Sequence, residues 1–187
     1  MRLFVALDFP DSIRDTIREL IARLKPAAKG ARWVRPEGMH VTLKFIGHVD
    51  AKKVAAIEDA LAPVRSARPV EMFFRGIGFF PNDRRPRVAW CGIEASANLA
   101  ALAADVERAL VPLGIAADSR DFVPHLTLAR FEQGARADEL VRAASEFQSQ
   151  DFGSAKEIEF HLFESILKPS GAEYKKVRSY PFMKEKA

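Results

Sequence analysis

Two histidines in this chain stand in the same short pattern, His-x-Thr-Leu. They are His40 in HVTLKF and His125 in HLTLAR, followed by Thr42 and Thr127. The chain holds four histidines and three threonines, and random placement of these residues gives roughly 0.06 His-x-Thr triplets. Two triplets are therefore a strong signal. The alternative interpretation, two structural histidines held by hydrogen bonds, is the weaker one.

The four side chains suit the opening of a cyclic phosphodiester. This reaction needs a base that deprotonates water on one side of phosphorus and an acid that protonates the leaving oxygen on the other. Imidazole titrates near neutral pH and can do either, and threonine hydroxyls can donate hydrogen bonds to the non-bridging oxygens. Two histidines on separate strands, without a cluster of carboxylates or cysteines, make a poor zinc site. The pair therefore predicts acid–base chemistry without a metal or another cofactor.

Both motifs have the composition of β-strands, in which successive side chains point to opposite faces. Histidine and threonine then share one face of the strand, and aliphatic residues such as Val41 and Leu43 occupy the other. If the two strands are related by symmetry, both imidazoles and both hydroxyls meet in one cleft.

The segments around the motifs repeat at a spacing of about 85 residues. Strand-like runs at 2–9 and 87–93 precede the motifs, and strands at 70–80 and 156–167 end the two repeats. We expect a last strand at 174–182 to pair with 156–167. Apolar stripes at helical spacing predict four helices, and the stripes are Ile13, Ile17, Leu20, Ile21 and Leu24; Val54, Ile57, Leu61 and Val64; Leu99, Leu102, Val106 and Leu110; Leu140, Val141, Ala144 and Phe147.

This organisation predicts one α+β domain over 1–187, built from repeats at about 1–80 and 86–187. We expect two pseudo-symmetric lobes that enclose a central cleft, each an antiparallel-rich sheet with helices on its outer face. The repeat alone does not give a function, because the same scaffold could be an inert binding module.

Composition narrows the setting. The chain is 48% hydrophobic and lacks the apolar run that a membrane span needs, and its start has no signal-peptide pattern. The single cysteine, Cys91, excludes an internal disulfide and lies in an apolar run. We expect a cytoplasmic monomer without a membrane partner. A net charge of +4 mildly favours an anionic ligand.

The paired motifs resemble those of the two-histidine phosphoesterase superfamily. The segments FVALDFP, FPNDRRPRVAW and LFESILKPSGAEY resemble its RNA 2′,3′-cyclic phosphodiesterase branch, historically called 2′-5′ RNA ligase, over nearly the whole chain. The resemblance implies a two-lobed fold with a central cleft and no cofactor. It also implies hydrolysis of an RNA terminal 2′,3′-cyclic phosphate to a 2′-phosphate, with reversible 2′-5′ joining of RNA ends.

On that resemblance His40 is the general acid for the leaving 3′ oxygen and His125 the general base for water, while Thr42 and Thr127 hold the phosphate. The two motifs are so alike that the acid and base roles could be exchanged. Two other functions stay open. One is the same chemistry on small cyclic nucleotides or ADP-ribose cyclic phosphate, and the other is a non-catalytic RNA-binding module.

Four further residues are candidate substrate contacts. Arg130 completes HLTLAR and is a phosphate ligand in the family pattern, although strict alternation puts it on the face opposite His125. Lys44 is expected on the face of His40, where it meets the RNA backbone or ends in solvent. Phe45 packs in the core, which we favour, or stacks on a base. Arg85 lies in the turn PNDRRP, where basic side chains hold downstream phosphates or are simply solvated.

Three residues are left without an assigned role. Trp33, which precedes the first motif, has two interpretations: its ring packs in the core or stacks on a base. His48 and His161 lack a threonine two places on, and we interpret both as structural or surface residues.

Overall fold

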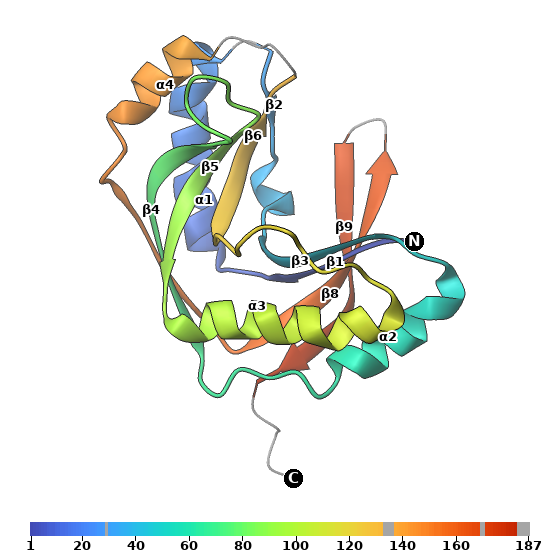
Figure 1. The fold of residues 1–187 in the computed structure, drawn as a ribbon. Coiled ribbons are helices and arrows are strands. Elements are labelled where there is room, and N and C mark those ends of the chain that lie inside the picture. Colours follow the sequence, from blue (N-terminus) through green and yellow to red (C-terminus); the bar gives the residue numbers. More distant parts are fainter. Residues whose placement is uncertain (29, 133–136, 169–170, 183–187) are drawn as a thin grey trace.

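A computed structural model describes residues 1–28, 30–132, 137–168 and 171–182. Two sheets and the helices that pack on them form the fold (Figure 1). The elements in chain order are β1 (Arg2–Leu7), α1 (Asp11–Leu24), β2 (Arg32–Trp33), β3 (Val41–His48), α2 (Val54–Leu61), β4 (Val70–Phe80), β5 (Val88–Ala95), α3 (Ala97–Leu110), β6 (His125–Arg130), α4 (Asp138–Ser145), β7 (Asp151–Glu157), β8 (Glu159–Lys168) and β9 (Gly171–Pro181).

Both sheets are antiparallel. One has the strand order β3-β1-β8-β9 and the other β2-β6-β5-β4-β7. In Figure 1 the β8–β9 hairpin and the second sheet rise on the two sides of β1 and β3. The predicted α+β class with two antiparallel sheets is confirmed, and so is the pairing of the last strand, β9, with β8.

The sheets do not divide where the two sequence repeats join. β4 comes from the first repeat but pairs with β5, and β8 comes from the second but pairs with β1. Each lobe therefore contains strands of both repeats, which corrects the expectation of one lobe per repeat. The physical reason for β4 is local: the short turn at 81–87 makes β4 and β5 a hairpin, so β4 must join its neighbour's sheet. The expected strand 156–167 also divides, at the exposed Ile158, between β7 and β8.

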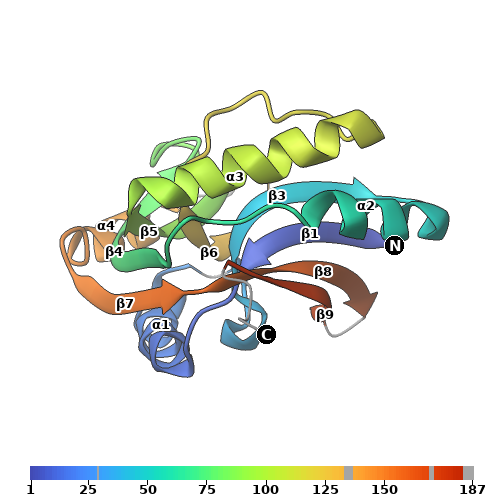
Figure 2. The same ribbon diagram turned by 90° about the horizontal axis from the view of Figure 1, so that it is seen from below.

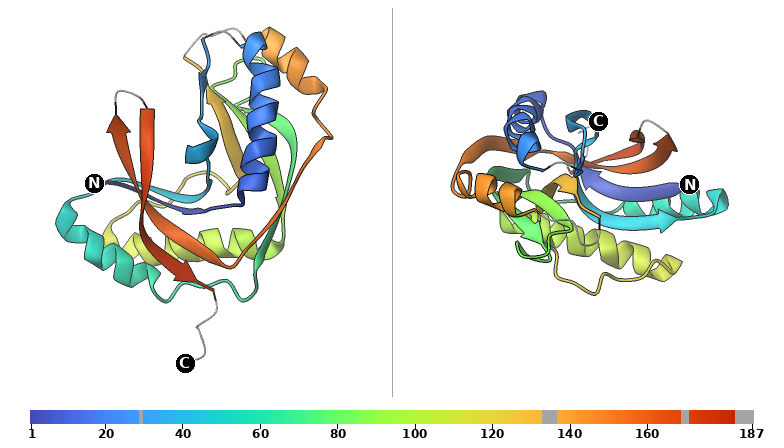
Figure 3. Two further views of the ribbon diagram at one scale, coloured as in Figure 1. Left: turned by 180° about the vertical axis from the view of Figure 1, so that it is seen from behind. Right: turned by 90° about the horizontal axis from the view of Figure 1, so that it is seen from above.

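Each long helix crosses to the other sheet as well. α1 follows β1 but packs against β7, beside α4, whereas α3 follows β5 but packs against β3, beside α2. Figures 2 and 3 show α2 and α3 together on one side of β1 and β3, and α1 beside β7. The apolar stripes predicted for α1 and α3 are buried in full. Each buried Leu or Ile side chain contributes about 1.5–3 kcal/mol, so these stripes attach the helices to the sheets.

A β-bulge interrupts both motif strands at the same place. In β3, Thr42 and Lys44 have successive partners on β1, which leaves Leu43 extra. In β6, Thr127 and Ala129 have successive partners on β5, which leaves Leu128 extra. An extra residue shifts the alternation of side chains by one position.

Burial of the side chains follows the bulge. After the histidine and threonine, two consecutive residues are buried in each strand and the next is exposed; the exposed residues are Phe45 in β3 and Arg130 in β6. The bulge therefore returns Phe45 to the face of His40 and Arg130 to the face of His125. It also turns Lys44 to the opposite face of β3.

Candidate active site

His40 is half-buried at the start of β3, within a group of aromatic rings. Its ring lies 4.3 Å from the ring of Phe4 and 5.0 Å from that of Tyr174, centroid to centroid. Its Nδ1 is 3.0 Å from the carbonyl oxygen of Gly38. A carbonyl oxygen only accepts hydrogen bonds, so Nδ1 carries the hydrogen and Nε2 of the neutral ring is left as a base.

His125 is held in the same way at the start of β6. Its Nδ1 donates to the carbonyl oxygen of Val123 at 2.8 Å, again two residues before the histidine. The rings of Phe80 and Trp90 lie beside it, at 5.1 and 6.4 Å between centroids. Both motifs therefore present an imidazole with a fixed Nδ1–H and an Nε2 available for proton transfer.

The two motif strands meet between the sheets. β3 and β6 are in contact, and Thr42 and His125 line one hollow of about 730 Å³ together with Phe45. The charge of Arg130 acts on the pKa of both His40 and His125, so its guanidinium lies within electrostatic reach of both rings. His40 itself lines a second, smaller hollow and not this one.

Burial lowers the pKa of His40 to about 4, because the half-buried ring disfavours the charged form. The hydrogen bond to Gly38 and the charge of Asp8 oppose this effect, while the charges of Arg14 and Arg130 add to it. Burial also lowers the pKa of His125. Both imidazoles are therefore largely neutral at pH 7 in the free protein.

An anion bound between the rings should reverse this shift. A nearby negative charge favours the imidazolium, so we expect saturating inorganic phosphate to raise the titration midpoints of His40 and His125 by about 1 pH unit or more. The measurement is an NMR pH titration of the imidazole resonances with and without phosphate, with His48, an exposed residue of β3, as the internal control. A midpoint for His40 near 6.5 in the free protein would contradict the prediction.

Two substrate-contact candidates lie on the cleft face because of the bulge. Arg130 is exposed there rather than on the opposite face. Phe45 is 48% exposed, so its expected core packing is wrong. Its ring stacks at 6.1 Å on Phe4, and the guanidinium of Arg2 lies 5.1 Å from its centroid.

Lys44 borders the same hollow as Thr42 and His125, but its side chain is buried in ion pairs. Its side chain is 2% exposed, and its Nζ contacts Glu107 Oε1 at 2.7 Å and Asp118 Oδ2 at 2.9 Å. The expectation of a backbone contact on the face of His40 is therefore wrong, because it assumed unbroken alternation through Leu43.

The hollows that border His40 and His125 are not lined by Arg85, Trp33 or His161. Arg85 is exposed in the turn after β4, where its backbone N–H donates to the Asn82 side chain at 3.0 Å. Trp33 packs against the core. His161 is buried, with Nδ1 2.8 Å from the Ser179 hydroxyl, as expected of a structural histidine.

Burial raises the pKa of the Cys91 thiol to about 12, which excludes it as a nucleophile near neutral pH.

Tertiary structure adds residues near His40 that the sequence did not single out. Asp8, Arg14, Tyr174 and Lys176 line a smaller hollow of about 150 Å³ with His40. They come from the end of β1, from α1 and from β9. No local spacing connects these positions to the motif; only Asp8 and Tyr174 fall in segments that resemble the family.

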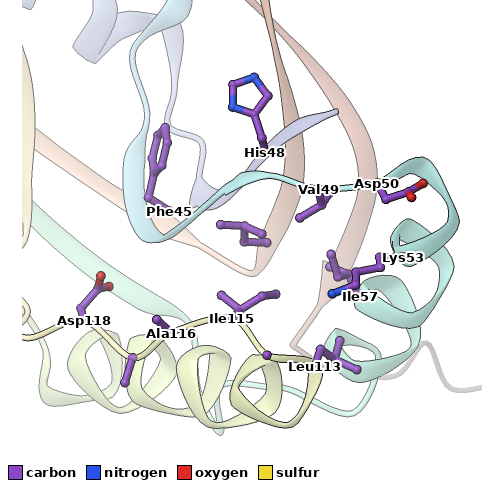
Figure 4. Close-up of a pocket in the computed structure, with 13 residues that line it drawn as sticks. Phe45, His48, Val49, Asp50, Lys53, Ile57, Leu113, Ile115, Ala116 and Asp118 are labelled. Atoms are coloured by element: carbon purple, nitrogen blue, oxygen red, sulfur yellow. The ribbon is translucent and has the colours of Figure 1, made fainter.

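A groove of about 490 Å³ continues from the larger hollow, since Phe45 and Asp118 line both. Figure 4 shows the apolar side chains Ile57, Leu113 and Ile115 on its floor, with Lys53 near α2. The groove runs along the end of β3, beyond the histidines.

Among the described residues, no helix is both long and apolar enough to span a bilayer. Among the same residues, no three His, Cys, Asp or Glu side chains gather in a set that could hold a metal ion.

Comparison with known proteins gives consistent matches over the length of the chain. An RNA 2′,3′-cyclic phosphodiesterase of Archaeoglobus fulgidus is 38% identical, over 96% of this chain and 99% of its own length. The enzyme of the same name from Methanothermobacter thermautotrophicus is 35% identical, over 93% and 95%. The crystal structure of Escherichia coli LigT with 3′-AMP has a TM-score of 0.79, with 25% identity over 98% of both chains.

A second solved structure, that of TT0787 of Thermus thermophilus, covers 100% of both chains with a TM-score of 0.82 and 27% identity. The family described as "LigT like Phosphoesterase" matches residues 7–90 and 93–174, which together include both His-x-Thr motifs. The chain belongs to this family of LigT-like phosphoesterases.

Proposed function

We propose that this protein hydrolyses the 2′,3′-cyclic phosphate at the end of an RNA to a 2′-phosphomonoester, without a metal. One observation carries the proposal: two imidazoles on contacting strands are held identically, each with Nδ1 bound to a carbonyl and Nε2 available. The names of the relatives, RNA 2′,3′-cyclic phosphodiesterases, agree with this chemistry.

In the proposed reaction, Nε2 of each histidine carries out one proton transfer. Nε2 of His125 removes a proton from water, the hydroxide attacks phosphorus, and the bond from phosphorus to the 3′ oxygen breaks. His40, protonated on Nε2, gives that proton to the 3′ oxygen. Thr42 and Thr127 donate hydrogen bonds to the non-bridging oxygens, and Arg130 balances their charge. The reversible 2′-5′ joining of RNA ends would use the same groups in the opposite direction.

The groove beyond Phe45 favours an RNA over a mononucleotide as the substrate. Phosphate held between the histidines leaves the next nucleotide to lie past the exposed ring of Phe45, which can stack on a base. The groove that begins there has an apolar floor and Lys53 at its edge. A small cyclic nucleotide or ADP-ribose cyclic phosphate would leave this groove unused.

We propose that the protein acts as a monomer in the cytoplasm. The strands β3, β1 and β8 of the first sheet have counterparts from the other repeat, β6, β5 and β4, at the equivalent places in the second sheet. One chain therefore supplies both histidines and both threonines. The buried Cys91 is compatible with a reducing compartment.

An RNA with a 2′,3′-cyclic phosphate end tests the activity. In excess EDTA we expect it to be converted to a 2′-phosphate end, because the proposed steps need only imidazole and hydroxyl groups. The products can be resolved by ³¹P NMR, which separates cyclic, 2′- and 3′-phosphates. Binding without turnover would support the non-catalytic RNA-binding alternative, and loss of turnover on chelation would contradict the absence of a metal.

Substitution in the groove tests the polymer preference. Ile115→Glu places a carboxylate on the groove floor, so kcat/KM for a dinucleotide with a cyclic phosphate end should fall roughly tenfold. The value for the mononucleotide cyclic phosphate should stay unchanged, since that substrate does not reach the groove. Val111→Glu, at an exposed position outside the groove, is the matched control. An equal fall for both substrates would show that the groove does not bind the second nucleotide.

A further inference from the structure

We propose that Arg14 and Lys44 are positioning residues, each a buried cation that anchors the loop whose backbone carbonyl orients one of the two histidines. Arg14 acts on His40 and Lys44 acts on His125. The catalytic meaning of this arrangement rests on the proposed function, but the orientation itself does not.

Arg14 holds the turn before His40. Its side chain, on α1, is 11% exposed, and Nη1 donates to the carbonyl oxygens of Pro36 at 2.7 Å and Met39 at 2.9 Å. Gly38, whose carbonyl accepts the Nδ1–H of His40, lies between these two anchored residues. Asp8 pairs with the guanidinium, so the buried charge is neutralised. The direction of the Gly38 carbonyl is thus fixed from α1.

Lys44 holds the loop before His125. Besides its two carboxylate partners, Glu107 and Asp118, its Nζ donates to the carbonyl oxygen of Ala116 at 2.8 Å. Glu107 also accepts the backbone N–H of Asp118. These contacts anchor the beginning of the segment 116–124, whose Val123 carbonyl accepts the Nδ1–H of His125. Lys44 thus acts on the Val123 carbonyl through the five residues that follow Asp118, and not by direct contact.

Burying a cation is costly unless it is paired and fully hydrogen-bonded, so both residues need a structural reason. Arg14 joins α1, and Lys44 joins β3, to the loop whose carbonyl accepts the Nδ1–H of a histidine. That carbonyl selects the tautomer, and an imidazole in the wrong tautomer can lose about 10⁴-fold in kcat. Loosening either carbonyl should mix the tautomers of one imidazole and leave the other unchanged.

The test is ¹⁵N NMR of the imidazole nitrogens in the full chain. With Arg14→Met, His40 should change from one tautomer to a mixture while His125 keeps its signals. With Lys44→Met, the opposite pattern is expected. In each variant kcat should fall by about 10- to 100-fold with KM changed by less than threefold, because orientation acts on the reacting step. Arg14→Lys, which keeps the charge on a single donor nitrogen, should restore part of the kcat.

Arg23→Met is the matched control. Arg23 is on the same helix but exposed, and its guanidinium lies over the ring of Phe147, so both tautomers and kcat should be unchanged. Where Lys44→Met does not fold, Lys44→Met with Glu107→Gln removes the charge together with one of its two carboxylate partners and gives the same readout.

Unchanged tautomers in the Arg14 and Lys44 variants, or a variant that alters both histidines equally, would overturn the inference. The NMR signals do not depend on RNA turnover. An inactive wild-type protein with these selective effects would therefore contradict the proposed function alone.

Discussion

Replacing either His40 or His125 with alanine should lower kcat/KM on an RNA 2′,3′-cyclic phosphate by about 10³-fold or more. Each imidazole is assigned one proton transfer, and a positioned acid or base contributes about 10²–10⁴-fold. Both rings have an Nδ1–H bound to a carbonyl and Nε2 left for the reaction. Removal of either ring therefore eliminates the group that transfers one of the two protons.

The variants should remain folded. Each substitution removes one hydrogen bond to a carbonyl, which contributes about 1 kcal/mol, and the ring contacts of a half-buried side chain. Thermal melts monitored by circular dichroism check this point, and Val111→Ala, at an exposed position outside the groove, provides a control with normal turnover. The double variant should lose little more than one single variant, because the two residues act as a unit. Near-normal turnover by either single variant would remove that histidine from the mechanism.

The pH dependence follows from the lowered pKa values. The base is lost as pH falls and the acid is lost as pH rises, so kcat/KM should be bell-shaped. Since burial lowers the pKa of both histidines in the free protein, the optimum of kcat/KM should lie on the acid side of an unperturbed pair. A bound phosphate raises both values, so the profile of kcat should lie at higher pH than that of kcat/KM. The two midpoints belong to the pair rather than to either residue.

Arg130→Ala should lower kcat by about 10²-fold. The bulge at Leu128 places Arg130 on the face of His125, where its charge can offset the charge that develops on the non-bridging oxygens. Loss of one such preorganised group typically costs about 10²–10³-fold. Arg130→Lys should restore only part of the rate, because a lysine cannot donate two parallel hydrogen bonds to a phosphate.

A second readout separates this role from a general loss of structure. The charge of Arg130 lowers the pKa of both His40 and His125, so its removal should raise both titration midpoints in the free protein. Arg32→Ala is the matched control: Arg32 is the strand partner of Arg130, but it is 78% exposed and pairs with Glu132. Unchanged kcat and unchanged midpoints in Arg130→Ala would place the guanidinium outside the site.

The sequence by itself was sufficient to predict the two long helices and the two motif histidines. Apolar residues at helical spacing mark α1 and α3 because one face of a helix must be buried wherever it packs. The two His-x-Thr triplets single out His40 and His125 because their residue types are rare in this chain and recur at matching places. The family resemblance rests on the same motifs, and the family match includes both of them.

Only the tertiary structure decided on which face of its strand each residue after the motif threonine lies. A bulge depends on the pairing of two strands and has no signature in one strand, so alternation misplaced Lys44, Phe45 and Arg130 together. The exchange of β4 and β8 between sheets likewise depends on which strands meet across the join. The buried cation Arg14 reaches the turn that contains Gly38 only through contacts between elements distant in the chain. Periodicity specifies which residues share a face of one element, whereas the packing of elements specifies what that face meets.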